Sequence, residues 1–377
     1  MSVSQALGGK SRCGRAIGPS LDKIVKNAAW RKHSHLVSSC KSVLDKLDSI
    51  SEASLDPASP IAGLSPADAE FVLQPLLLAL DAAYVKVAEP ALECVFKLFS
   101  RGLFRGEIER PDGEANSGAS SIVYRIVESV CKSGGLGDEG IELIVLRVLL
   151  SAVRCPCVLI RGDCLVNVVR TCYNVYLGGL SGTNQICAKS VLGQIMIIIF
   201  SRMEEDSMDV PASIISVNEL LEFTDKNLNE GNSIYFCQNF INEVMDASEG
   251  VADKKLFSSW GQLQNGNASP LKADNKGESD VGETEDVAES GGCSKIREDG
   301  FHLFKNLCKL SMKFSSPEHP DDQILLRGKT LSLELLKVIM DKAGSVWRLN
   351  ERQAFHSSSI ILVLLMEVFI TALKLHD

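Results

Sequence analysis

The stretch TNQICAKSVLGQIMIIIFSRME (residues 183–204) is the most apolar run of its length in the chain, although polar residues open and close it. A membrane-spanning helix needs roughly 18 consecutive apolar residues. Gln194 interrupts this run and Arg202 ends it, and a second apolar run at 360–370 contains Glu367. Both runs have the length of buried core helices, so we interpret 183–204 as a core helix and not as a membrane anchor.

Helical periodicity extends over most of the remaining chain. Apolar residues recur at three- and four-residue steps, for example at Leu36, Cys40, Val43 and Leu47, which is typical of an amphipathic helix. Ser20 after Pro19, and Ser65 before Pro66, predict helix starts. Further helices are predicted at about 90–102, 119–132, 138–153, 162–177, 216–228, 232–247, 297–314, 321–342 and 348–375.

Short helices with broad apolar faces must stack on their neighbours to bury those faces. The sequence therefore predicts an all-α fold, an armadillo- or HEAT-like α-solenoid. We find no alternation of apolar and polar residues that would indicate a sheet. With 45% hydrophobic and 23% charged residues, the 377-residue chain can bury a sizeable core.

Composition divides the chain into four predicted parts. Residues 1–18 are predicted to be a flexible basic N-terminus, and 19–250 the helical solenoid. Residues 251–296 are acidic, rich in Gly and Ser and without periodicity, which predicts a disordered linker. Residues 297–377 are predicted to be a second, truncated helical segment, because the chain stops without a capping signal and suggests a piece of a longer protein.

The sequence offers few candidates for chemistry. Gly135, Gly137 and Gly140 match G-x-G-x-x-G, but a helical pattern precedes them and the acidic pair at 138–139 would repel phosphate, so an interhelical turn is favoured. Catalytic motifs such as H-E-x-x-H and G-x-S-x-G are absent from the sequence. We therefore expect neither an enzyme nor a bound cofactor or metal.

The twelve cysteines lie mostly inside apolar helical patterns, and the N-terminus does not resemble a signal peptide. Both features favour reduced thiols that pack as small hydrophobes. Cys155, Cys157, Cys164 and Cys172 are close enough in sequence to suggest zinc. Structural zinc prefers paired cysteines on loops, however, and the last two lie within a helical pattern. Core and loop thiols are the favoured interpretation.

Two sets of residues are candidate interaction surfaces. Residues 1–46 carry nine Lys or Arg and two Asp, and Lys23, Lys26, Arg31 and Lys32 form a candidate basic patch. An ordinary solvated face is the favoured interpretation of this patch. The alternative is contact with anionic lipid, an acidic partner or the acidic linker. The overall net charge of −9 argues against nucleic acid.

The second candidate is the helix from residue 183. Asn184, Gln185, Lys189 and Arg202 are expected to cap the turn or to form a polar rim. The remaining candidates, Met196, Ile198 and Phe200, lie outside the main apolar stripe and are expected to face either a neighbouring helix or a partner chain. Together these seven residues are the candidate protein-interaction surface.

Two long stretches resemble a known family. SRCGRAIGPSLDKIVKNAAWRKHSHLVSSCKSVLDKL (11–47) and YLGGLSGTNQICAKSVLGQIMIIIFSRME (176–204) are similar to the N-terminal region of the large Arf guanine nucleotide-exchange factors of the brefeldin A-inhibited class, in its plant form. The resemblance implies a helical DCB (dimerisation and cyclophilin-binding) domain, an acidic linker and the start of the HUS (homology upstream of the catalytic domain) region at 297–377.

The resemblance also implies partners and a location. These are a homodimer through the DCB domain, the HUS region of the parent exchange factor, cyclophilin-type and small-GTPase partners, and peripheral association from the cytosol with trans-Golgi network and endosomal membranes. The glutamate-bearing loop of the family's catalytic domain has no counterpart here, so we expect no exchange catalysis from these residues. A regulatory and dimerisation module is the leading hypothesis, and a stand-alone solenoid adaptor is the alternative.

Overall fold

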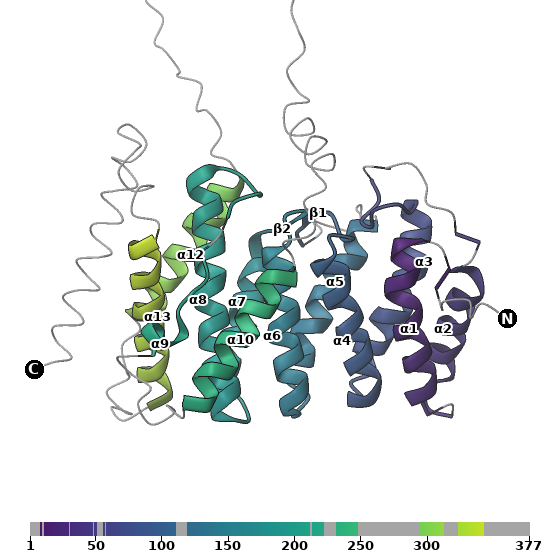
Figure 1. Cartoon of the computed structure of the whole chain (residues 1–377), viewed down its shortest axis with the longest axis horizontal. Coiled ribbons are helices and arrows are strands. Elements are labelled where there is room, and N and C mark those ends of the chain that lie inside the picture. Colours follow the sequence, from purple (N-terminus) through teal and green to yellow (C-terminus); the bar gives the residue numbers. More distant parts are fainter. Residues whose placement is uncertain are drawn as a thin grey trace, which may run out of the picture.

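The computed structural model describes residues 8–9, 11–29, 31–47, 49–50, 56, 58–110, 119–211, 213–221, 231–247, 295–312 and 323–342. These residues form helices joined by short turns, with one pair of short strands (Figure 1). The elements are α1 (Arg12–Asn27), α2 (Ser34–Leu47), α3 (Pro66–Asp81), α4 (Val85–Ser100), β1 (Gly106–Ile108), α5 (Ala119–Ser133), α6 (Glu139–Arg154), β2 (Val158–Ile160), α7 (Gly162–Gly178), α8 (Gly182–Glu205), α9 (Val217–Leu220), α10 (Gly231–Ala247), α12 (Lys295–Ser311) and α13 (Gln323–Lys342).

The helices stack in one elongated row, from α1 and α2 at one end to α13 at the other (Figure 1). Helix α1 packs on α4, α4 packs on α6 and α6 packs on α8. In a second series, α3 packs on α5, α5 on α7 and α7 on α8, so the two series meet at α8. A single continuous core of apolar side chains runs through this row. The prediction of an all-α, solenoid-like fold is confirmed.

Local sequence signals set several helix starts. The Ser65 hydroxyl accepts a hydrogen bond from the backbone N–H of Asp68, and Pro66 occupies the first helical turn of α3. In the glycine-rich turn before α6, Asp138 caps the helix by accepting from the Ile141 N–H. Gly137 has a φ of +72°, which glycine adopts without strain. The G-x-G-x-x-G match is therefore a helix-to-helix turn.

The N-terminal boundary was predicted wrongly. Helix α1 begins at Arg12, with Ser11 as its cap, and Ser20 is a buried residue inside it. The prediction that residues 1–18 are flexible is thus wrong for 12–18, and residues 1–7 lie outside the described part. The interior Pro19 misled the sequence interpretation, since proline removes one helical hydrogen bond. Burial of the apolar stripe of α1 against α4 outweighs that loss.

A small parallel sheet was also missed. Strand β1 pairs with β2 in the register Gly106 to Val158 and Ile108 to Ile160. Each strand has only three residues, which is too short to show a period-two pattern. The predicted linker is two residues too long at its end, because Lys295 and Ile296 already belong to α12. Its residues 251–294, and the predicted helix at 348–375, lie outside the described residues.

Helix α8 is the central helix of the C-terminal half and contacts α6, α7, α10, α12 and α13. In the described part of the chain it is the one helix long and apolar enough to cross a membrane, and 94% of its most apolar window is buried inside the fold. A core helix of a soluble fold has the same properties. The prediction that 183–204 is a core helix is confirmed.

The apolar members of the candidate protein-interaction surface are therefore corrected. Met196, Ile198 and Phe200 are all buried, so they face neighbouring helices, the first of the two alternatives. They do not form a surface open to a partner chain in this structure. The reason is that α8 is apolar around nearly its whole circumference and is covered on every side by helices of the same chain.

We predict that Ile198→Asp unfolds the C-terminal half of the solenoid. Ile198 is 2% exposed, and an unpaired carboxylate in an apolar core is expected to destabilise the fold by about 4 kcal/mol or more. The control is Ile214→Asp, at a position that is 42% exposed. Urea unfolding followed by circular dichroism measures both variants. Equal stability of the two variants would contradict the core position of Ile198.

Candidate functional site

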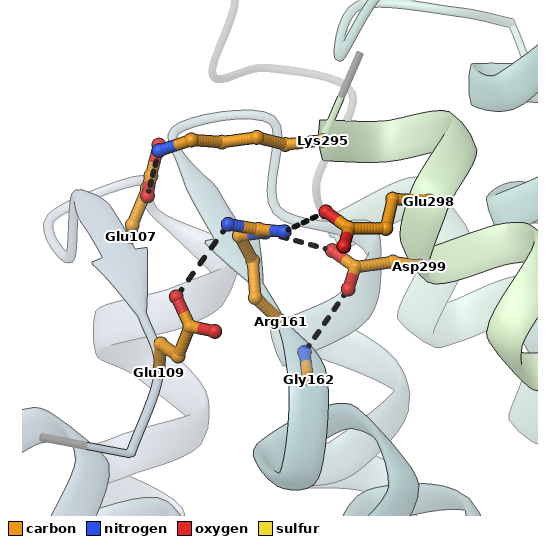
Figure 2. A network of polar contacts seen from close by, with 7 residues as sticks. All are labelled: Glu107, Glu109, Arg161, Gly162, Lys295, Glu298 and Asp299. Atoms are coloured by element: carbon orange, nitrogen blue, oxygen red, sulfur yellow. Dashed lines mark hydrogen bonds and ion pairs between the residues drawn. The ribbon is translucent and has the colours of Figure 1, made fainter. Parts of the chain in front are cut away.

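Among the described residues, a group of buried and half-buried polar contacts lies where α12 and α13 meet the solenoid. We call this contact the seam: α12 and α13 on one side, and α7, α8 and the β1–β2 pair on the other. Its side chains come from residues more than a hundred positions apart in sequence. Figure 2 shows the part of the seam that surrounds Arg161.

Arg161 is the centre of a charged network at the start of α7 (Figure 2). Its Nε lies 3.0 Å from Asp299 Oδ2, and its Nη2 lies 3.0 Å from Glu298 Oε2, both on α12. On the opposite side, Nη1 lies 3.5 Å from Glu109 Oε2, just after β1. One buried guanidinium thus joins the strand pair to α12.

Burial by itself lowers the pKa of the Arg161 guanidinium. The hydrogen bond to Asp299 and the negative charges of Asp299, Glu109 and Glu107 outweigh burial and raise the pKa. The same carboxylates therefore compensate the desolvation of the buried cation. Near the edge of the network, Lys295 Nζ lies 2.9 Å from Glu107 Oε2 and adds a second link between α12 and β1.

Asp299 also caps a helix to which it does not belong. The backbone N–H of Gly162, the first residue of α7, donates to Asp299 Oδ1 at 3.1 Å. The helix's own cap residue, Arg161, makes no side-chain capping bond. A carboxylate at a helix N-terminus satisfies an unpaired N–H and interacts favourably with the helix dipole. Gly162 has a φ of +48°, and a Cβ there would lie 3.2 Å from Glu109 Oε1.

The polar residues predicted on α8 contribute a second part of the seam. Lys189 Nζ lies 2.8 Å from Glu334 Oε2 of α13, and the lysine side chain is fully buried. Gln185 Oε1 accepts a hydrogen bond from Arg327 Nη2 at 2.9 Å. The Arg327 guanidinium also stacks over the Tyr176 ring at 4.9 Å. Gln185 Nε2 also donates to the Gly179 carbonyl at 3.0 Å, so it caps the turn before α8, the first of the two alternatives. Lys189 and Gln185 both bind helix α13 of the same chain.

Asn184 and Arg202 connect α8 to α6 instead. Asn184 Nδ2 donates to Glu142 Oε2 at 2.7 Å and to the Glu139 carbonyl at 3.0 Å. At the other end of α8, the Arg202 guanidinium donates to the carbonyls of residues 153–155, at the C-terminus of α6. Burial lowers the pKa of Arg202 to about 10. Neither side chain forms an exposed rim, which corrects that expectation.

The candidate basic patch is exposed, as expected for a solvated face. Lys23 Nζ lies 3.4 Å from Glu93, and Lys26 Nζ lies 2.5 Å from Asp22. Arg31 and Lys32 lie in the turn between α1 and α2. Two of its four cations pair with carboxylates of the same chain, which lowers the net positive charge of the patch. A functional contact of this patch stays a prediction.

The four clustered cysteines do not converge on one point. Cys155 and Cys157 lie in the turn before β2, and Cys164 and Cys172 lie in α7; all four are buried. In the part of the chain that the structure describes, three or more His, Cys, Asp or Glu side chains nowhere come together in a way that could hold a metal ion.

Sequence reasoning singled out Lys189 and Gln185 on α8 but missed their partners on α13 and the whole network around Arg161. Arg161, Asp299, Arg327 and Glu334 were not singled out. A signal was available for Asp299, since it follows Ile296 by three residues and precedes Leu303 by four, which places a carboxylate on the apolar face of its helix. A charge on an apolar face indicates a buried partner.

The fold and the seam together define a class of protein: a helical solenoid whose last helices carry a second helical segment. Two family models match. The first, described as the Mon2/Sec7/BIG1-like dimerisation and cyclophilin-binding (DCB) domain, matches residues 10–207. The second, the Mon2/Sec7/BIG1-like HUS domain, matches residues 296–375. The chain belongs to this Mon2/Sec7/BIG1-like family, and the resemblance found in the sequence is confirmed.

The curated relatives include brefeldin A-inhibited guanine nucleotide-exchange proteins 4 and 1 of Arabidopsis thaliana. Each is 59% identical to this chain over a stretch that covers 93% of this chain. Brefeldin A-inhibited guanine nucleotide-exchange protein 1 of Homo sapiens is 23% identical over 88% of the chain. The chain spans about a fifth of the length of the Arabidopsis relatives. Helices α1 to α8 lie in the DCB match and α12 and α13 in the HUS match, so the seam joins the DCB and HUS domains.

We predict that Asp299→Ala destabilises the seam by about 3 kcal/mol or more, because it removes a buried partner of Arg161 and the cap of α7. The Asp299 side chain is 9% exposed. Glu298→Ala is the matched control, because Glu298 contacts the same guanidinium but its side chain is 68% exposed; we expect a change of about 1 kcal/mol or less.

The stability of the seam in both variants is measured by hydrogen exchange of the backbone amides in α12 and in the first turn of α7. We expect faster exchange in Asp299→Ala only. Unchanged protection in that variant would show that the carboxylate does not hold the seam.

Proposed function

We propose that this chain is the N-terminal regulatory and dimerisation module of a large Arf guanine nucleotide-exchange factor. The observation that carries the proposal is the seam, which seats the HUS helices on the last DCB helices through buried pairs, Arg161 with Asp299 and Lys189 with Glu334. Buried charged pairs favour one register of the two domains over others. We infer that the module acts as a single scaffold and not as two independent domains.

The activity of the whole exchange factor forms the second part of the proposal. A protein containing this module would promote GDP-for-GTP exchange on Arf GTPases during vesicle transport, from the cytosol and at trans-Golgi network or endosomal membranes. The names of the Arabidopsis relatives support guanine nucleotide exchange. We further propose homodimerisation through the DCB domain, and cyclophilin-type and small-GTPase proteins as partners.

We predict that the purified 377-residue chain does not accelerate nucleotide release from Arf GTPases, because the two matched domains are not the exchange domain of the proposed parent. The measurement is release of a fluorescent GDP analogue from Arf at micromolar chain, with a catalytic exchange domain as positive control. Acceleration that grows with chain concentration would refute the assignment of a purely regulatory role.

We also predict that the chain is a dimer at tens of micromolar, by size-exclusion chromatography with light scattering. The dimer contact does not use Met196, Ile198 or Phe200, because those side chains are buried within the protomer. Asp299→Ala is expected to remain dimeric if the contact lies in the DCB domain. A monodisperse monomer would defeat the dimerisation proposal and favour the stand-alone adaptor.

A further inference from the structure

Gln194 interrupts the apolar run of α8, and the seam does not use it. Its side chain is fully buried, and both polar atoms of its amide bind the main chain that follows α8. Nε2 donates to the Ser213 carbonyl at 3.0 Å, and Oε1 accepts from the Ile215 N–H at 2.9 Å. A buried amide that is satisfied in this way fixes the passing main chain in one position.

Gln238 of α10 continues the same pattern. Its Nε2 donates to the Ile215 carbonyl at 3.1 Å, and its Oε1 accepts from the Val217 N–H at 2.9 Å. The two glutamines thus bind the backbone of alternate residues, as a neighbouring strand would. We call residues 213–217 the clamped segment, because these two side-chain amides hold one edge of it.

The side chains of the clamped segment also anchor it to α8. Ile215 is buried, and it lies so close to Gly193 of α8 that a Cβ at this glycine would collide with Ile215 Cδ1. Val217, at the end of the segment, is fully buried. The backbone of the clamped segment is therefore held in a fixed, extended position on the surface of the solenoid.

The opposite edge of the clamped segment is open. Ile214 is 42% exposed, and neither its N–H nor its C=O forms a hydrogen bond with any residue that the structure describes. The same holds for the Ser216 N–H, whereas the Ser216 carbonyl accepts from Leu220. Three main-chain groups on one edge are thus available. An open edge of this kind accepts an extended peptide through main-chain hydrogen bonds.

Two grooves meet at Ile214. The first has a volume of about 440 Å³ and extends to Asn242 and Asp246 of α10. The second also has a volume of about 440 Å³ and extends to Glu219 of α9 and Asp341 of α13. Because the side chains of an added strand point alternately to its two faces, the grooves can receive side chains from both faces of a bound peptide.

The charges of the two grooves select the occupant. Asp246, Glu219 and Asp341 line them, and Lys337 is the one cation among the described lining residues. The remaining carboxylate, Glu334, is paired across the seam. A second copy of this chain would bring the same carboxylates to the edge, and like charges repel across paired strands. Lys or Arg side chains would instead be attracted.

We propose that the open edge of the clamped segment binds an extended peptide of another protein, in which Lys or Arg alternates with apolar residues. The peptide main chain pairs with Ile214 and with the Ser216 N–H. Its apolar side chains cover Ile214, and its cations reach the carboxylates of the grooves. Since Asp341 belongs to the HUS match and Ile214 follows the DCB match, the second groove is complete only when α13 is seated on the solenoid.

The test is fluorescence anisotropy of a labelled octapeptide of alternating lysine and valine, titrated with the full 377-residue chain at low salt. We expect saturable binding with a dissociation constant below about 1 mM. An octapeptide of alternating glutamate and valine should bind at least about tenfold more weakly. The lysine peptide N-methylated at every residue keeps its charge but loses its main-chain donors, and we expect a loss of about tenfold for it as well.

Two pairs of variants locate the site. Ile214→Pro removes the outward N–H, and proline is tolerated at a strand edge that faces solvent; we expect binding about tenfold weaker. Ile214→Ala, the matched control, keeps the N–H and should lose about threefold or less. Asp341→Asn should weaken binding about threefold at low salt and have no effect at about 1 M salt, whereas Asp163→Asn, a carboxylate outside both grooves, should have no effect at either.

Circular dichroism verifies the fold of each variant. If Ile214→Pro alters the spectrum, the N-methylated peptide decides whether the main chain is used. Four outcomes would overturn the proposal: absence of saturable binding, equal binding of the N-methylated peptide, equal binding by Ile214→Pro and Ile214→Ala in folded form, or equal binding of the glutamate peptide. A change from dimer to monomer in Ile214→Pro, measured by light scattering, would also overturn it, because the edge would then pair with a second copy.

Discussion

The structure depends on one constraint: α8 is apolar around nearly its whole circumference and must be covered on every side. An ordinary solenoid helix buries one broad face and leaves the opposite face to solvent. Here α6 and α7 cover part of α8, α10 covers another part, and α12 and α13 cover the rest. Because exposed aliphatic surface is unfavourable in water, the HUS helices complete the core of the DCB solenoid.

Apolar burial alone would leave the position of α12 and α13 poorly defined, since it has little directionality. The charged groups of the seam fix the position of these two helices. Lys189 and Arg161 are buried cations, and each is paired with a buried or half-buried carboxylate of the other segment. A shift of α12 by one helical turn would separate Asp299 from both Arg161 and the Gly162 N–H. Burial therefore brings the two domains together, and the charges select one register.

Much of this architecture follows from the sequence, and what was missed has physical reasons. The three- and four-residue periodicity predicted the helices and their stacking, and the density of apolar residues predicted a core position for 183–204.

The role of Lys189 and Gln185 could not be assigned, because a polar residue on a helix gives no information about which distant helix will meet it. The start of α1 was missed because Pro19 suggested a boundary, whereas packing on α4 carries the helix through it. Strands β1 and β2 are defined by pairing across about fifty residues, which local patterns do not show.

The intersegment cap at Asp299 has a consequence for assembly. In the sequence, α10 ends at Ala247 and α12 begins at Lys295, so a long connection separates the HUS helices from the solenoid that they cover. The carboxylates of Asp299 and Glu334 bind the first N–H of α7, Arg161 and Lys189. The same groups would bind these carboxylates equally well from a second molecule. Seam contacts of this kind are compatible with domain swapping, in which each protomer completes the core of the other. Local concentration then decides between the closed monomer and the exchanged pair, since a tethered segment competes with an untethered one through its effective concentration.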